Sequence, residues 1–260
     1  MTWTFFWRAW HYLRSSIRRV HVRHCRPTPE QKLIRRAKAN LCEDRAPIEI
    51  IDFGAACGEG PPVIRHSTVS RVVRSASKPS RQAERLAWWV VKRKAQNVLE
   101  LGTCLGTTSA VLAAVPHRPK VVSLEGDPGL AARARAFISQ LNASIASDAT
   151  TGASSEPLSV EVVEGEISSV LPEVVMRHQW DLVFIDGHHT AAALSGQLAA
   201  IIPQLASEAC VIIDDIYWSR DMHAGWTLHS GSEYFSEVLD EFHHGVLLRG
   251  DIFAPETSAK

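Results

Sequence analysis

The sequence predicts an α/β fold: a doubly wound, mostly parallel seven-stranded sheet with an antiparallel edge hairpin and an amino-terminal helical extension. Short apolar runs alternate with helical patterns over residues 97–214, which is typical of a parallel sheet wrapped by helices. A glycine-bearing turn follows the first run, where open sheets of this kind bind ligands. Two strand-like runs at 234–242 and 246–253 predict the closing hairpin.

Composition limits the class of protein. Hydrophobic residues make up 45% of the 260 and charged residues 22%, as in folded globular chains. No apolar run reaches the roughly 18 residues that a membrane-spanning helix needs. The five cysteines are widely spaced, and without a C-x-x-C pair they predict neither a disulfide framework nor a zinc site. We therefore expect a cytoplasmic protein.

The amino-terminal segment, residues 1–47, is expected to form a helical extension. Its first 24 residues predict a basic, aromatic amphipathic helix, because tryptophan and aliphatic residues recur at helical spacing between arginines. This helix would pack on its own domain or in a homodimer, or it would lie on a membrane surface. The acidic remainder of the chain argues against a nucleic-acid partner, which would favour a basic face on the folded domain.

The second segment, residues 48–260, is expected to form the main domain, with residues 48–80 as its cover. Glycines at 54–60 superficially resemble a cofactor turn, but two prolines and the lack of a later acid-tipped strand favour a covering loop. Residues 144–157 predict a flexible insertion. Strands are expected at 48–53, 97–102, 120–125, 159–163, 181–186 and 210–214, and helices at 81–95, 107–115, 129–141, 167–177, 189–205 and 219–229.

The strongest local signal is the strand and turn at 97–108. Gly102 allows the backbone to turn close to a ligand, and Gly106 allows the next helix to start tightly. Cys104 stands where the second glycine of a dinucleotide fingerprint would be, which argues against a nicotinamide-dependent oxidoreductase. Glu125 ends the following strand, where an acid binds ribose hydroxyls, while Asp127 is the better cap for the next helix.

These residues resemble the class I S-adenosylmethionine-dependent methyltransferases, most closely the catechol O-methyltransferase-like branch, over residues 68–253. The resemblance implies a Rossmann-like fold and S-adenosylmethionine as cofactor. The stretch 214–226 is similar to a bacterial subgroup of unknown substrate. By resemblance the cofactor contacts are Glu100, Gly102, Thr103, Cys104, Gly106 and Thr108 for the methionine part, Glu125 and Gly126 for the ribose, Glu166 for the adenine, and Asp186 and His188 beside them.

Three carboxylates follow neighbouring strands, at Asp186, Asp214 and Asp215. By resemblance this set would hold Mg²⁺, which suits hard oxygen ligands. Two departures weaken that implication, because Asp215 replaces an asparagine and His188-His189 stands near the usual catalytic lysine. Without metal, His189 beside Asp186 would take the proton of the acceptor. Both versions stay open, with a lean towards the metal-independent one.

The expected function is methyl transfer to a small-molecule acceptor, most simply at oxygen. The acceptor pocket is expected to include Trp218, Met222 and Trp226, whereas His243 and His244 are expected to be solvated in a hairpin. A noncatalytic scaffold, docked to a membrane or a partner through the basic amino-terminal helix, is the alternative.

Overall fold

The computed structural model describes residues 27–53, 61–147 and 156–250. The helix expected over residues 1–24, the glycine segment 54–60 and most of the expected insertion lie outside these residues. The described strands are β1 (Pro47–Asp52), β2 (Val63–Thr68), β3 (Asn97–Leu101), β4 (Lys120–Glu125), β5 (Val160–Glu164), β6 (Trp180–Ile185), β7 (Leu205–Asp214), β8 (Glu237–Asp240) and β9 (His244–Leu248). The described helices are α2 (Pro29–Glu43), α3 (Val69–Ala76), α4 (Ser80–Lys92), α5 (Thr107–Ala113), α6 (Pro128–Ser147), α7 (Ile167–Val175), α8 (Ala191–Ile201), the 3₁₀ turn η2 (Ile202–Gln204) and α9 (Arg220–Ser230).

The main sheet has seven strands in the order β5-β4-β3-β6-β7-β9-β8. The first five pair in parallel, whereas β9 pairs antiparallel with both β7 and β8. The order reverses beside β3, which makes the ends of β3 and β6 the topological switch point where open sheets bind ligands. The predicted α/β fold, doubly wound sheet and antiparallel edge hairpin are confirmed.

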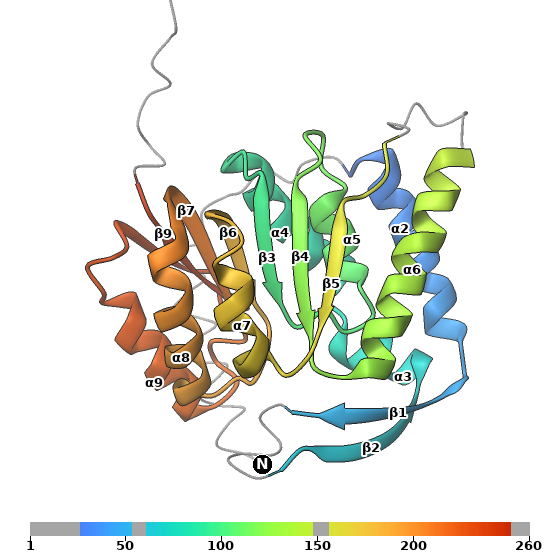
Figure 1. The fold of residues 1–260 in the computed structure, drawn as a ribbon, viewed down its shortest axis with the longest axis horizontal. Helices are drawn as coiled ribbons and strands as arrows, with labels where there is room; N and C mark the ends of the chain where they lie inside the picture. Colours follow the sequence, from blue (N-terminus) through green and yellow to red (C-terminus); the bar gives the residue numbers. More distant parts are fainter. Residues whose placement is uncertain (1–26, 54–60, 148–155, 251–260) are drawn as a thin grey trace, which may run out of the picture.

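The core lies on both faces of this sheet. Residues that alternate along each strand face opposite sides, because the side-chain period of a strand is two. Val98 and Phe184 pack with α2, α4, α5 and α6, while Leu99 and Ile185 pack with α7, α8 and α9. Figure 1 shows α7, α8 and α9 in front of the sheet, with α4 and α5 behind it. Because the central strands are buried on both faces, their sequences read as nearly continuous apolar runs.

Helix α2 is part of the core rather than of a separate extension. Ile34 is 1% exposed and packs in the same cluster as α4 and α5. The Thr28 side chain caps α2 and also donates to the Ala114 carbonyl oxygen at 3.1 Å, and Arg118 pairs with Glu30 at 2.6 Å. The expected boundary at residue 47 therefore does not separate two packing units within the described residues.

The two-stranded sheet β1-β2 lies across the carboxyl ends of the parallel strands (Figure 1). It is tied there by the Ile51 N–H, which donates to Asp127 Oδ2 at 2.7 Å, and by Ile48, which packs with Leu105 and Leu130. Neither β2 nor α3 was predicted. β2 is mostly exposed and lacks a clear alternation of apolar side chains. This arrangement places the cover segment against the ligand-binding edge.

Several element limits differ from the predicted ones. Helix α6 continues to Ser147, well past residue 141, because Ile145 is buried against the core. Strand β7 begins at Leu205, where the helix predicted to reach residue 205 has already ended. Among the described residues, no helix combines the length and apolar character needed to cross a membrane.

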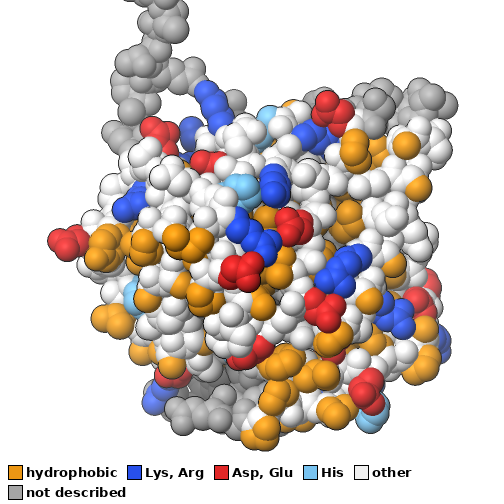
Figure 2. Space-filling view, viewed as in Figure 1, with side chains coloured by type: hydrophobic (Ala, Val, Ile, Leu, Met, Phe, Trp, Pro, Cys, Tyr) orange, Lys and Arg blue, Asp and Glu red, His pale blue; other side chains and the backbone are white. Residues whose placement is uncertain are grey.

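Surface charges are mixed in sign on the face viewed in Figure 2, where basic and acidic side chains stand side by side. Ion pairs join Arg135 to Glu164 at 3.1 Å and Arg177 to Glu161 at 2.9 Å. Exposed pairs of this kind stabilise a fold by only about 0.2–1 kcal/mol each. They orient surface side chains of α6, of β5 and of the turn after α7, and the core provides the stability.

Candidate active site

The turn after β3 has the strained backbone of a ligand-binding loop. Gly102, Cys104 and Gly106 all have positive φ, at 102°, 52° and 75°. The Gly102 N–H donates to the Leu124 carbonyl oxygen at 3.0 Å, which fixes the turn after β3 against the end of β4. A Cβ on Gly106 would lie 3.2 Å from the Cβ of Ala134, so this glycine allows α5 and α6 to approach closely. Strained backbone outside glycine is costly and concentrates at functional sites.

The Glu125 carboxylate closes the same turn. It accepts from the Cys104 N–H at 2.7 Å and from the Asp127 N–H at 2.9 Å. Burial raises the pKa of Glu125 to about 7, and the backbone hydrogen bonds offset only part of that rise. Asp127 caps α6 by accepting from the Leu130 N–H, as expected, so Glu125 is not the cap of this helix.

The Glu100 side chain lies inside the protein, near the end of β3. It is fully buried and accepts hydrogen bonds from the hydroxyls of Ser109 and Ser123. Burial raises the pKa of Glu100 to about 7. Thr103 and Thr108 are also buried, at 2% and 7% exposed. By resemblance Glu100, Thr103 and Thr108 were expected to contact the methionine part of the cofactor. In the structure their side chains are buried around the turn, and the cofactor contact stays a prediction.

Residues expected near the adenine and ribose lie on the other side of the turn. Glu166 precedes α7 and accepts from the hydroxyls of Ser168 and Ser169 at 2.6 and 2.7 Å. These bonds lower its pKa, and the charge of His188 acts in the same direction. His188 has a strained φ of 66°. The contact of Glu166 and His188 with a cofactor stays a prediction.

Gly126 meets an aromatic ring from the cover segment. A Cβ on Gly126 would lie 2.8 Å from Cδ2 of Phe53, at the end of β1. Phe53 therefore covers the backbone next to Glu125. Phe53 could not be identified from the sequence, because it lies more than 70 residues before Glu125 and follows a strand with no distinctive pattern.

A charged cluster occupies the ends of β6 and β7. Lys78, from the loop between α3 and α4, contacts Asp186 Oδ1 at 3.2 Å and forms a close ion pair with Asp214 Oδ2. Burial alone would lower the pKa of Lys78, but Asp186 and Asp214 together raise it above its usual value. For Asp186, burial and the charge of Asp214 raise the pKa.

His244 is part of the same cluster. Its Nε2 lies 3.1 Å from Asp214 Oδ1, and its side chain is 3% exposed. Burial would raise the pKa of Asp214, yet the contacts with His244 and Lys78 hold it below its usual value. The expectation that His244 is solvated is corrected, because β9 is an interior strand of the sheet rather than the edge of the hairpin.

The arrangement of the cluster does not fit the expected metal site. Among the described residues, no group of three His, Cys, Asp or Glu side chains is arranged to hold a metal ion. The Lys78 ammonium lies between the carboxylates of Asp186 and Asp214, where a divalent cation would have to be. Asp215 has a φ of 50° and donates its N–H to the His243 carbonyl oxygen. A cation could bind these three carboxylates only if Lys78 moved.

His189 lies beside the cluster, as expected from the sequence. Its Nε2 is 3.8 Å from Asp186 Oδ1, and its ring centroid is 5.6 Å from that of Trp218. Burial lowers the pKa of His189, so the imidazole is neutral at pH 7 and can accept a proton. Its φ of 31° adds to the strained residues at this edge.

The expected acceptor pocket is only partly correct. Trp218 is 47% exposed beside His189 and can face a ligand. Met222 and Trp226 are buried in the core at 2% and 5% exposed. The Trp226 ring packs so closely on Gly245 that a Cβ there would lie 2.4 Å away. Met222 and Trp226 therefore hold α9 on the sheet and do not line a pocket.

Comparisons with known proteins agree with the fold described above. Residues 99–216 match a family model described as "Methyltransferase domain". A search of the curated proteins found no match. Among solved structures, the O-methyltransferase TomG from Streptomyces achromogenes, in complex with SAM, has a TM-score of 0.54 at 16% identity, covering 96% of this chain and 100% of that one. The O-methyltransferase from Bacillus cereus, in complex with SAH, has a TM-score of 0.54 at 16% identity, covering 94% and 98%. The SAH-bound methyltransferase PaMTH1 from Podospora anserina has a TM-score of 0.53 at 16% identity, covering 67% and 80%.

Residues 99–216 thus match a methyltransferase domain, and the main sheet has the Rossmann-like methyltransferase fold. At the level of fold, its neighbours are O-methyltransferases, which confirms the resemblance drawn from the sequence.

Proposed function

We propose that this protein transfers a methyl group from S-adenosylmethionine to an oxygen of a small-molecule acceptor. The observation that carries the proposal is the Glu125 carboxylate, which is held by two backbone N–H groups beside the strained turn at the end of β3. This is the position at which an acid accepts hydrogen bonds from ribose hydroxyls. The cofactor-bound state of TomG and of the Bacillus cereus enzyme supports the same ligand here.

The cofactor would lie along the carboxyl edge of the sheet. The backbone of Gly102 to Gly106 would meet the methionine part, Glu125 and Gly126 the ribose, and Glu166 and His188 the adenine. Phe53 would cover the ribose side of this site, because its ring already lies on Gly126. Asp186 directly follows β6 and lies next to Gly102, so the sulfonium methyl would face the cluster that contains His189.

We propose His189 as the general base. It would take the proton of the acceptor hydroxyl while the oxygen attacks the methyl carbon in line, and the carbon–sulfur bond electrons would go to the sulfur. Positioning the two reactants within about 3 Å with water excluded supplies most of the acceleration in such a displacement. The reaction as proposed involves no divalent cation, because Lys78 already neutralises the carboxylates that would bind one.

The test is transfer of a labelled methyl group from S-adenosylmethionine to a pool of small molecules, followed by identification of the labelled product. We expect an O-methyl product, formed equally well in EDTA. An N-methyl product would overturn the choice of oxygen, and restoration of lost activity by Mg²⁺ would overturn the metal-independent version.

The alternative, a noncatalytic scaffold with a docking amino-terminal helix, rests on the basic segment alone. The two are distinguished by Glu125→Ala: if the wild-type protein binds cofactor and this variant does not, the sheet edge is a working site. A cytoplasmic location, peripheral membrane contact and a homodimer also remain proposals from the sequence.

A further inference from the structure

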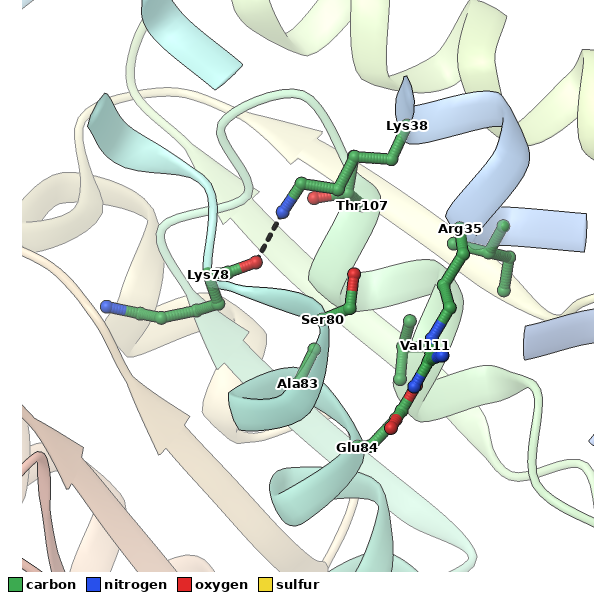
Figure 3. A pocket seen from close by; sticks show the side chains of 9 residues that line it. Arg35, Lys38, Lys78, Ser80, Ala83, Glu84, Thr107 and Val111 are labelled. Carbon is green, nitrogen blue, oxygen red and sulfur yellow. Dashed lines mark hydrogen bonds and ion pairs between the residues drawn. The ribbon is translucent and has the colours of Figure 1, made fainter. Parts of the chain in front are cut away.

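The backbone of Lys78 is held in place by a hydrogen bond from helix α2. Lys78 lies in the short loop between α3 and α4, before Pro79, which is the N-cap residue of α4. Its carbonyl oxygen accepts from the Lys38 ammonium of α2, and Figure 3 shows its side chain extending in the opposite direction. The pocket on the Lys38 side holds about 10 Å³, room for a single water at most. The loop therefore fixes the direction of the Lys78 side chain without a ligand.

The Lys78 side chain is directed at two buried carboxylates. The side chains of Lys78, Asp186 and Asp214 are 11%, 14% and 2% exposed. Two carboxylates that share one buried site repel each other, and one of them must be neutralised by a proton or a cation. Lys78 contacts both, and His244 contacts the second oxygen of Asp214. The site thus contains its own cation.

We propose that the Lys78 ammonium replaces the divalent cation of this site and is its fixed positive charge. This inference rests on the proposed function. An ammonium has three N–H donors, and two are directed at Asp186 and Asp214. The third would donate to the acceptor oxygen and stabilise its negative charge while His189 takes the proton. Lys78 stays protonated throughout, so it is a source of charge and not a base.

Binding of Mn²⁺, measured by electron paramagnetic resonance, tests the proposal without cofactor or substrate. We expect the wild-type protein to show no stoichiometric site up to about 1 mM, the weak limit for protein cation sites. Lys78→Ala should create one site per chain, because it leaves Asp186 and Asp214 without their counter-charge. Lys78→Ala/Asp214→Asn should lose that site again. Lys92→Ala, which removes an exposed lysine at the end of α4, is the control and should behave as wild type.

A wild-type Mn²⁺ site that Asp214→Asn removes would overturn the proposal, and so would the absence of a site in a folded Lys78→Ala protein. If Lys78→Ala does not fold, thermal unfolding replaces the titration. The proteins compared are then Lys78→Met, Asp214→Asn and the double variant Lys78→Met/Asp214→Asn. We expect the double variant to be more stable than Lys78→Met, because it removes the uncompensated carboxylate; equal or lower stability would contradict the proposal. Failure of the proposed function would be seen separately, as absent S-adenosylhomocysteine binding by the wild-type protein.

Discussion

Gly102 and Asp186 approach so closely that a Cβ on Gly102 would lie 2.4 Å from the Asp186 carbonyl oxygen. The two residues directly follow the neighbouring strands β3 and β6, and the Asp186 N–H donates to the Leu101 carbonyl oxygen at 2.9 Å. This contact joins the turn expected to bind the cofactor to the cluster expected to bind the acceptor. The absence of a side chain at residue 102 therefore sets the distance between the two halves of the site.

Gly102→Ala should weaken both the fold and the site. The added Cβ meets the Asp186 backbone, and φ at residue 102 is 102°, so strain of about 1–3 kcal/mol is expected. Gly196→Ala is the matched control, since no atom lies within 4 Å of a Cβ there and the residue is inside α8. That change should stabilise the fold by about 0.5–1 kcal/mol. Thermal unfolding and S-adenosylhomocysteine binding check both, and equal effects of the two substitutions would contradict the account.

Glu125 should make cofactor affinity depend on pH. Burial raises its pKa to about 7, so the carboxylate is present above that pH and is lost as the pH falls through it. Since the charged form is the better acceptor for ribose hydroxyls, S-adenosylhomocysteine should bind more weakly at pH 6 than at pH 8, by roughly tenfold per pH unit at most. Glu125→Gln should bind weakly at both, because its amide cannot accept from Cys104 and Asp127 together. Calorimetry at several pH values measures this, and an unchanged pH dependence in the variant would exclude Glu125 as the titrating group.

His189→Ala should lower kcat by about 10²–10⁴ if His189 is the base, with little change in cofactor affinity. Because burial lowers the pKa of His189, wild-type activity should persist somewhat below pH 6.5 before the imidazole is protonated. His178→Ala is the control, since His178 precedes β6 at the opposite end of the same strand. Steady-state rates in EDTA report the result. A His189→Ala enzyme with the wild-type rate would remove this residue from the mechanism.

Deletion of residues 1–24 should leave cofactor binding unchanged. The described part of the chain retains α2 with its Thr28 cap, which is bonded to Ala114, so the core does not lose its first helix. If the deleted segment packs in a dimer, sedimentation should show a monomer; if it binds lipid, salt-sensitive binding to anionic vesicles should disappear. Loss of cofactor affinity on deletion would show instead that the segment belongs to the site.

The sheet could be predicted because its signals are local. Runs such as 97–101 and 120–125 are buried on both faces, and each is followed by turn residues and a helical pattern. Glu125 and His189 could be placed for the same reason, because Glu125 ends β4 and His189 lies in the loop shortly after β6, both at the carboxyl edge of the sheet. The hairpin at the edge was predicted from the spacing of its two runs, and β9 pairs with β8 as expected.

The rest of the site depends on contacts between distant residues. Lys78 and Asp214 are 136 positions apart, and no pattern around Lys78 marks it as a functional lysine. His244 was interpreted from its hairpin, but the pairing of β9 with β7 buries it against Asp214. Glu100 stands in the motif expected to bind the cofactor, and its burial with hydrogen bonds from Ser109 and Ser123 could not be read from the sequence pattern. A usable signal for α3 was present in the sequence: Thr68 is a good N-cap residue, and Val69, Val72 and Val73 follow at helical spacing.

Calorimetric titration of the wild-type protein with S-adenosylmethionine and S-adenosylhomocysteine tests the central claim most directly, because the claim is that the β3 turn and Glu125 form a cofactor site. We predict one site per chain for both ligands, and no comparable binding in Glu125→Ala. Absence of binding of either ligand at millimolar concentration by a folded wild-type protein would contradict the account.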